Sequence, residues 1–118
     1  MNTQTYKDII AWKKAHELAL VVYKLTNNFP KTEIFGLTSQ IRRAAVSVPS
    51  NLAEGFKRHH ANDSIHFYNI AQGSLEELRY QLLLSKDLFY IKTDEYQKAE
   101  NLADEVGKLI YGWIKGHH

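Results

Sequence analysis

The sequence contains no cysteine, and this absence excludes several kinds of site at once. Without thiols the chain forms neither a disulfide framework nor a thiolate zinc site, and it has no cysteine nucleophile. Proline is also scarce, with only Pro30 and Pro49, and no Gly/Ser-rich stretch marks a linker. We therefore expect residues 1–118 to form a single domain.

Long apolar runs and a strong net charge are missing as well. No run approaches the roughly 18 apolar residues that a membrane-spanning helix needs, and Met1 to Thr5 lack the regions of a signal peptide. We therefore expect a cytoplasmic protein with no membrane partner. The formal charge is only +2, so any binding of nucleic acid must depend on local clusters of cations. His117 and His118 resemble the remnant of a purification tag, and we assign them no function.

Four long segments with helical periodicity fill the chain, and none alternates with the period of two that marks a strand. The expected helices cover about 6–28, from between 32 and 37 to about 59, about 62–90, and from 93 onward. Asn62 to Ser64 supply N-cap chemistry for the third helix and Thr93 for the fourth, and the third apolar stripe ends at Phe89. Because short loops make neighbours antiparallel, the predicted fold class is all-α, an antiparallel up-down-up-down four-helix bundle.

Pro49 interrupts the second segment. A proline inside a helix lacks a hydrogen-bond donor and clashes with the carbonyl four residues earlier. The apolar stripe nevertheless keeps its phase from Val48 to Leu52 and Phe56. We therefore expect helix two to continue through this position with a kink near Pro49, rather than to divide into two helices.

The first two segments are apolar on more than one face. Ile10, Val21 and Leu25 make a second strip on the first segment, and Val46 and Ala53 lie away from the main stripe of the second. A helix that is apolar on two sides usually has a second partner to cover the other side. This pattern favours a homo-oligomer with helices one and two at the interface. The alternative is that small residues such as alanine and serine tolerate exposure.

A line of polar residues follows helix two at steps of three, four, four and three, so its members share one narrow arc. The line consists of Gln40, Arg43, Ser47, Asn51 and Glu54. In the interpretation that we favour, it is a structural ladder in which Arg43 and Glu54 pair with charges on other helices or subunits. In the other it is a functional groove, since buried titratable groups are often found in sites. A catalytic use of Arg43, Asn51 and Glu54 requires the line to border a cleft that solvent reaches.

Basic residues cluster in three places: Lys13-Lys14, Arg42-Arg43 and Lys57-Arg58-His59-His60. Cations suit the negative end of the helix dipole, and this alone explains the cluster that ends helix two. The functional interpretation is contact with phosphate groups. The candidates for nucleic-acid binding are Lys13, Lys14, Arg42, Lys57 and Arg58.

The sequence matches none of the common metal-binding or catalytic motifs. His59 and His60 are adjacent and therefore point about 100° apart on a helix, which makes a poor chelating pair. Glu76 and Glu77 lack the Glu-x-x-His repeats of di-iron bundles. Phosphate-binding glycine loops, nucleophile elbows and HExxH motifs are also absent. We expect a protein that is not an enzyme and uses no metal or cofactor.

Three stretches together resemble a known family. They are Trp12–Ala15 with Val22–Thr26 and Phe29-Pro30, then Gly36–Gly55, and then Ile70–Leu78. In this order they resemble the bacterial four-helix-bundle family encoded in intervening sequences of large-subunit ribosomal RNA genes, also described as S23 ribosomal protein-like. The run RRAAVSVPSNLAEG, from Arg42 to Gly55, is the most specific part.

The resemblance implies a four-helix bundle that forms ring-shaped homopentamers, and a fold similar to the nucleic-acid-binding accessory variability protein of diversity-generating retroelements. It assigns family positions to Arg42, Arg43, Asn51, Glu54, Gly55, Gly73, Ser74 and Glu77. From it we expect a non-catalytic homo-oligomer, a pentamer, that binds RNA or other nucleic acid through basic patches. The alternative is a structural assembly or protein-interaction adaptor without a nucleic-acid partner.

Overall fold

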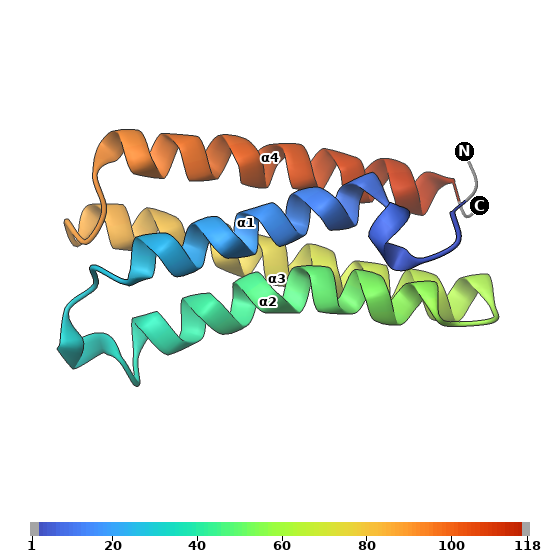
Figure 1. The fold of residues 1–118 in the computed structure, drawn as a ribbon, viewed down its shortest axis with the longest axis horizontal. Coiled ribbons are helices and arrows are strands. Elements are labelled where there is room, and N and C mark those ends of the chain that lie inside the picture. Colours follow the sequence, from blue (N-terminus) through green and yellow to red (C-terminus); the bar gives the residue numbers. More distant parts are fainter. Residues whose placement is uncertain (1–2, 117–118) are drawn as a thin grey trace.

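The computed structural model describes residues 3–116, so His117 and His118 lie outside the described residues. The helices are α1 (Ile10–Thr26), α2 (Leu37–Phe56), α3 (Ala61–Asp87) and α4 (Thr93–Lys115), with short 3-10 helices η1 (Tyr6–Asp8) and η2 (Lys31–Glu33). Residues 3–116 contain no strand (Figure 1). The predicted all-α fold class with four helices is therefore confirmed.

Consecutive helices run in opposite directions along the long axis of the molecule (Figure 1). Contacts between α2 and α3 follow this course, because Ser47 meets Ser74 whereas Gly55, later in α2, meets Tyr68, earlier in α3. Helix α1 packs against α2 and α4, and α3 packs against the same two helices from the other side. Helices α1 and α2 therefore form one side of the bundle, and α3 and α4 form another.

The bundle has two different ends. The start of α1, the end of α4 and the connection 57–60 lie together at one of them, which we call the terminal end (Figure 1). The connections 27–36 and 88–92 lie at the other, which we call the loop end. None of the helices in residues 3–116 has the length and hydropathy needed to span a lipid bilayer.

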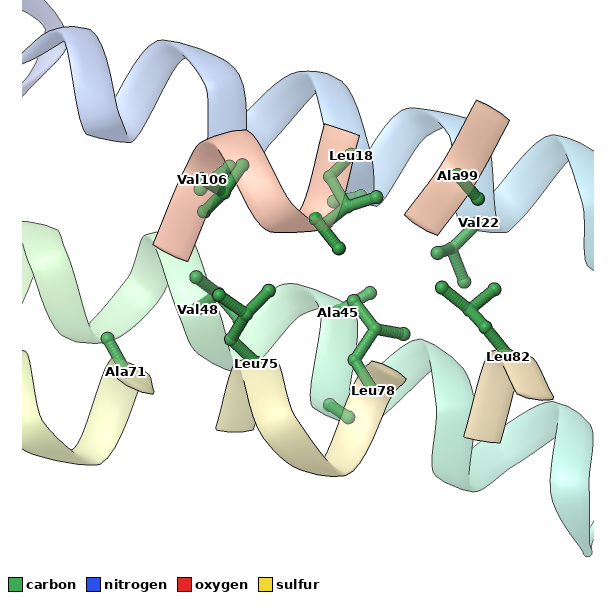
Figure 2. Packing of buried hydrophobic residues seen from close by; sticks show 14 of the residues in the cluster. Leu18, Val22, Ala45, Val48, Ala71, Leu75, Leu78, Leu82, Ala99 and Val106 are labelled. Carbon is green, nitrogen blue, oxygen red and sulfur yellow. The ribbon is translucent and has the colours of Figure 1, made fainter. Parts of the chain in front are cut away.

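One hydrophobic core fills the space between the four helices (Figure 2). Each helix contributes apolar side chains at intervals of three and four residues, such as Leu18 and Val22 of α1 and Leu75, Leu78 and Leu82 of α3. These side chains are almost completely buried. Each stabilises the fold by roughly 1.5–3 kcal/mol relative to an exposed position.

Helix α1 begins later than the sequence pattern predicts. The Thr5 hydroxyl accepts a hydrogen bond from the Lys7 N–H, and the Asp8 carboxylate accepts one from the Thr5 N–H. This capping box closes a separate 3-10 turn over Tyr6–Asp8. The helix proper therefore starts at Ile10 rather than near Tyr6.

The starts of α3 and α4 also differ from the expectation. Helix α3 begins at Ala61, so Asn62 to Ser64 are its first residues rather than its cap, and Ser64 is buried. The N-cap of α4 is Lys92, whose N–H donates to the Glu95 carboxylate at 2.8 Å. Thr93 is therefore the first helical residue. In both cases the cap lies one or two positions before the polar residues that favour it.

Helix α2 is continuous from Leu37 to Phe56, with Pro49 inside it. The proline is buried, and the apolar residues before and after it, Val48 and Leu52, both lie in the core. The predicted continuity of α2 is thus observed. The kink near Pro49 stays a prediction.

The turn after α3 places Phe89 in water. Its backbone has φ of 64°, in the left-handed region, and the Tyr90 N–H donates to the Ser85 carbonyl at 2.9 Å. This is the closing geometry of a helix C-terminus, where glycine is usual. The Phe89 ring is 93% exposed, so its prediction as the last member of the apolar stripe is wrong. Tyr90 instead packs inward, with its ring 5.3 Å from that of Phe29.

Candidate functional site

The outer surface where α1 and α2 meet is apolar. Four large hydrophobic side chains are exposed along it: Leu20, Tyr23, Ile34 and Val46. We call this surface the α1–α2 face. Two adjoining hollows of about 390 and 500 Å3 follow it, and Tyr23 and Val46 border both. A monomeric soluble protein rarely exposes a continuous apolar surface of this kind.

Aromatic rings form the part of the α1–α2 face nearest the terminal end. The Trp12 and His16 rings are stacked with centroids 5.1 Å apart, and the Tyr6 ring meets Trp12 edge-on at 5.1 Å. Val46 and Ala53, which the sequence singles out for an interface, lie on the same hollow as these rings. The structure thus places both residues on the exposed apolar surface; the interface itself stays a prediction.

Three members of the polar line of α2 border a groove against α3, and two of them, Arg43 and Ser47, also border the larger hollow of the α1–α2 face. Gln40, Arg43 and Ser47 border a groove of about 490 Å3 whose opposite wall is formed by Ser74 and Glu77 of α3. We call it the α2–α3 groove. Its floor includes a hydrogen bond between the Ser47 and Ser74 hydroxyls at 2.8 Å. The line therefore borders solvent at this point and joins two helices.

The remaining members of the line, Asn51 and Glu54, have partners four residues away in the sequence. The Asn51 amide donates to the Ser47 carbonyl oxygen at 2.8 Å. The Glu54 carboxylate binds the Arg58 guanidinium at 2.5 Å, one turn later in the same chain. Arg43 is exposed and has no hydrogen-bond or ion-pair partner within residues 3–116. Glu54 thus pairs locally and not across helices, and Arg43 is the free charge of the set.

Arg42 joins α2 to the end of α1. Its Nε donates to the Thr26 hydroxyl at 2.8 Å, and its Nη2 donates to the Asn27 side-chain oxygen at 3.3 Å. The guanidinium also lies over the Tyr23 ring, 4.7 Å from its centroid. Three intrachain contacts therefore hold Arg42, which is a candidate for phosphate contact.

Two other candidates are also engaged within the chain. Arg58 is paired with Glu54, and its guanidinium lies 4.5 Å from the centroid of the Phe67 ring. The Lys14 ammonium lies 3.5 Å from the Glu17 carboxylate. Exposed ion pairs of this kind contribute only up to about 1 kcal/mol, so a phosphate group can compete with the carboxylate in each pair.

Lys13 and Lys57 are exposed and form no ion pair in the described part of the chain. Hydrogen bonds from the Thr5 and Gln4 N–H groups lower the pKa of the Asp8 carboxyl, and the charge of Lys13 lowers it further. Lys57 follows the last residue of α2 at the terminal end. These two ammonium groups are therefore exposed and unpaired within the described residues.

Four of the five candidates belong to the half of the bundle at the terminal end, and the fifth does not. Lys13 and Lys14 lie in the first turns of α1, and Lys57 and Arg58 follow α2, so all four lie at the terminal end. Arg42 lies 15 residues before Lys57, which is about 22 Å at the rise of an α-helix. Arg42 is therefore too far away to belong to one phosphate-binding region at the terminal end.

The described residues contain no group of three or more histidine, aspartate or glutamate side chains placed to hold a metal ion. Of the three residues that a catalytic use of the polar line needs, only Arg43 borders the α2–α3 groove. Asn51 bonds within α2, and Glu54 pairs with Arg58, just after the end of α2. The groove thus brings together one cation, one carboxylate and polar side chains.

The family follows from comparison with known proteins. The family model described as 23S rRNA-intervening sequence protein matches residues 7–112. The chain belongs to this family. A solved structure from the S23 ribosomal protein family of Bacteroides thetaiotaomicron VPI-5482, a protein of unknown function, shares 28% identity and a TM-score of 0.80. The match covers 90% of this chain and 99% of that one, whereas no curated protein matches. The family predicted from the sequence motifs is confirmed.

Two of the family positions have a packing role that sequence reasoning did not identify. A Cβ atom on Gly55 would lie 2.5 Å from the Tyr68 ring, so only glycine lets α2 and α3 approach this closely. Ser74 supplies the hydroxyl that binds Ser47. Helical periodicity shows which face each residue occupies, but the register between two helices depends on packing, and so these pairs could not be found from one helix alone.

Proposed function

We propose that this member of the 23S rRNA-intervening sequence protein family is a non-catalytic module that assembles with copies of itself and binds RNA or other nucleic acid through basic side chains. The observation that carries the proposal is the exposed α1–α2 face, with Leu20, Tyr23 and Val46 at its centre. Covering this surface with another copy removes apolar area from water, which favours association.

The nucleic-acid part rests on the terminal end. Lys13 and Lys57 present free ammonium groups there, and the weak pairs of Lys14 and Arg58 add two more cations. A homo-oligomer repeats this group once per subunit, so that a modest charge on one chain becomes a multivalent surface. The family is named for intervening sequences of 23S rRNA, which makes structured RNA the first ligand to test.

The second candidate function is an assembly or adaptor module without a nucleic-acid partner. The contacts of Arg42 favour it, because this guanidinium is already bound to Thr26 and Asn27. If Arg58 and Lys14 keep their carboxylate partners as well, few cations remain for phosphate groups. The two functions share the self-assembly and differ in whether RNA binds.

A titration of labelled structured RNA, followed by fluorescence anisotropy at about 50 and 200 mM salt, separates the two functions. We expect binding that weakens steeply with salt, on an oligomer whose mass is measured by light scattering. The double variant Lys13→Gln/Lys57→Gln should lower the salt slope by about two. Lys31→Gln/Lys98→Gln, which removes two exposed lysines elsewhere, is the matched control. Absence of binding at the lower salt by an assembled oligomer would leave the adaptor.

A further inference from the structure

The α2–α3 groove displays two opposite charges that do not pair with each other. Arg43 lies on its α2 wall and Glu77 on its α3 wall. Within residues 3–116 neither of them forms an ion pair, whereas every other arginine binds a partner in the chain. The space between the two charges is therefore open to a ligand, which would make charge-assisted hydrogen bonds with both.

Glu77 keeps one of its two oxygens available. The amide of Gln81, a buried residue, donates to the Glu77 Oε2 atom at 3.3 Å. The Oε1 atom has no donor within residues 3–116, and the Glu77 side chain is exposed. An ionised carboxylate accepts hydrogen bonds and donates none. The α3 wall of the groove therefore suits a ligand group that donates, such as a hydroxyl.

The rest of the groove is polar as well. Gln40 and Arg43 supply N–H donors on the α2 wall, and the hydroxyl pair of Ser47 and Ser74 lies on the floor. Ala44 is the one apolar residue among those that line the groove. Without an aromatic or large apolar side chain, the groove offers no stacking surface to a nucleobase. Its ligand is therefore polar along its length, with an anionic group for Arg43.

Gly73 leaves space on the α3 wall beside Glu77. The two residues are four apart in α3, so they lie on the same face of the helix, one turn from each other. Glycine weakens the interior of a helix, and a Cβ atom on Gly73 would meet no other atom within 4 Å. The packing of the chain thus does not require this glycine. A position without a side chain allows a ligand to come close to the helix backbone.

From these observations we infer that the α2–α3 groove binds a ribose–phosphate unit. The phosphate accepts hydrogen bonds from the Arg43 guanidinium and the Gln40 amide, and the ribose 2′-hydroxyl donates to Glu77. Acidic side chains bind ribose hydroxyls in this way in dinucleotide-binding folds. RNA carries the unit at every nucleotide, whereas DNA lacks the 2′-hydroxyl. With RNA as its source, the inference rests on the RNA binding proposed above and adds a site that distinguishes RNA from DNA.

The carboxylate makes this site selective. Close to a phosphate backbone, a carboxylate that finds no donor is opposed by the like charge. A 2′-hydroxyl offsets this repulsion with a charge-assisted hydrogen bond, and the CH2 group of deoxyribose does not. Glu77 therefore favours RNA and disfavours DNA. Arg43 binds the phosphate and does not contact the sugar hydroxyl, so the two residues have separable effects.

Glu77 belongs to the groove and not to the neighbouring surfaces. Arg43 and Ser47 also border the larger hollow of the α1–α2 face, whereas Glu77 does not. Arg43 lies 14 residues before Lys57, which is about 21 Å at the rise of an α-helix. The groove is therefore distinct from the cations of the terminal end, and Glu77→Ala is the variant that changes the groove alone.

Fluorescence anisotropy with a structured RNA and its fully 2′-O-methylated form tests the inference, because methylation keeps the phosphates and removes the hydroxyl donors. We expect the wild type to bind the unmodified RNA about tenfold more tightly. Glu77→Ala should bind both forms equally, since the residue that contacts the hydroxyl is gone. Arg43→Gln should weaken the binding of both forms alike and lower the salt slope by about one.

Glu105→Ala is the matched control for Glu77→Ala. Glu105 is also exposed and unpaired within residues 3–116, but it lies on α4 and does not border the groove. Lys98→Gln, likewise on α4, is the control for Arg43→Gln. Both controls should keep the preference of the wild type for unmodified RNA. Circular dichroism should show the same helix content in all variants.

A second titration identifies the source of the ribose–phosphate unit. Ribose 5-phosphate and 2-deoxyribose 5-phosphate, followed by NMR chemical shifts at millimolar concentration, present the unit without a nucleic acid. If the wild type does not bind RNA but prefers ribose 5-phosphate, and Glu77→Ala removes this preference, the groove is supported and its ligand is a free sugar phosphate. This result would overturn the proposed RNA binding and leave the site standing.

The opposite result would leave the proposed function standing and overturn the inference. The wild type would then bind RNA without a preference for the unmodified form, or with a preference that survives Glu77→Ala. The contacts at the terminal end would in that case account for the RNA binding by themselves. Absence of binding in both titrations overturns the RNA binding and the inference together.

Discussion

The two long sides of the bundle are built differently. On the α3–α4 side the Arg79 guanidinium binds the Glu100 carboxylate at 2.9 and 2.5 Å, and it approaches Glu76 and Asp104 as well. Within residues 3–116 no ion pair joins α1 to α2, and large apolar side chains such as Leu20 are exposed there. The same chain thus joins one pair of helices with an ion-pair network and exposes large apolar side chains where the other pair meets.

The difference between the two sides indicates which of them a partner would cover. Exposed ion pairs add little stability, so the network around Arg79 serves mainly to make the α3–α4 side suitable for water. A side that stays in water needs such groups, whereas a side covered by another molecule is more favourable when it is apolar. The α1–α2 side follows the second pattern.

The largest expected effect is on the α1–α2 side. Leu20→Glu should weaken self-association by a hundredfold or more, about 3 kcal/mol at 1.4 kcal/mol per factor of ten, because it brings a charge into the apolar contact. Tyr111→Glu makes the same charge change on α4 at almost equal exposure, 60% against 59% for Leu20, and should have no effect. Sedimentation equilibrium over a range of concentrations measures both. Equal loss of mass in the two variants would show that the two sides do not differ in assembly.

The next effect concerns the seam between α2 and α3, which connects the two sides. Gly55→Ala should destabilise the fold by about 2–3 kcal/mol, since its Cβ would lie 2.5 Å from the buried Tyr68 ring and one of them must move. Gly73→Ala, in open space on the other wall of the seam, should increase the stability of the monomeric chain by up to about 1 kcal/mol. Urea unfolding of both variants, made in the Leu20→Glu background, checks the contrast. A stable Gly55→Ala variant would mean that the seam is looser than the structure shows.

A smaller effect is expected on the α3–α4 side. The hydrogen bond to Glu100, followed by the nearby carboxylates, raises the pKa of Arg79, so the charged guanidinium is favoured in the fold. Arg79→Ala should reduce the free energy of unfolding by about 1 kcal/mol and should leave the oligomer mass unchanged. Urea unfolding and light scattering give the two quantities. A monomeric Arg79→Ala would move the interface to the side that the charges cover.

The smallest effect is at the loop end, where a hydrogen bond links the two sides. The Glu33 carboxylate accepts bonds from the Leu37 N–H at 3.1 Å and from the Tyr90 hydroxyl at 2.8 Å. These bonds, the first above all, lower the pKa of Glu33. A lowered carboxyl pKa adds stability above the unfolded pKa of about 4.3, and this stability is lost as the pH falls through the folded pKa.

Glu33→Gln should therefore be slightly less stable than the wild type at pH 7 and should show a shallower loss of stability in acid. Urea midpoints at several pH values between about 7 and 3 measure it. Identical acid profiles for the two proteins would show that the carboxylate makes no difference at the loop end.

The four helices and the family could be predicted from the sequence, because periodic apolar residues and the run from Arg42 to Gly55 are both local signals. It was less reliable at helix ends. The Thr5–Asp8 turn delays α1, and the left-handed turn at Phe89 removes a ring from the stripe where it was expected. Both depend on a few backbone hydrogen bonds that compete with continuing the helix.

The candidate site was predicted in part. Periodicity places Gln40, Arg43 and Ser47 on one arc, and all three border one groove. It gives no information on the facing residues of α3, since register is set when the helices pack. The basic clusters could also be recognised in the sequence. The sequence did not show that Thr26 and Asn27 bind Arg42 near the loop end of the bundle. Which charges stay free is a property of the tertiary structure.

The bundle has two unlike ends, and in a ring-shaped homo-oligomer, which the family resemblance implies, these ends would give the assembly a polarity. A ring with only a rotation axis has no operation that exchanges its rims. One rim would display the Phe35 and Phe89 rings of every subunit, and the other would display Lys57 and Arg58. A molecule that binds one rim would then face in a fixed direction relative to anything bound to the other.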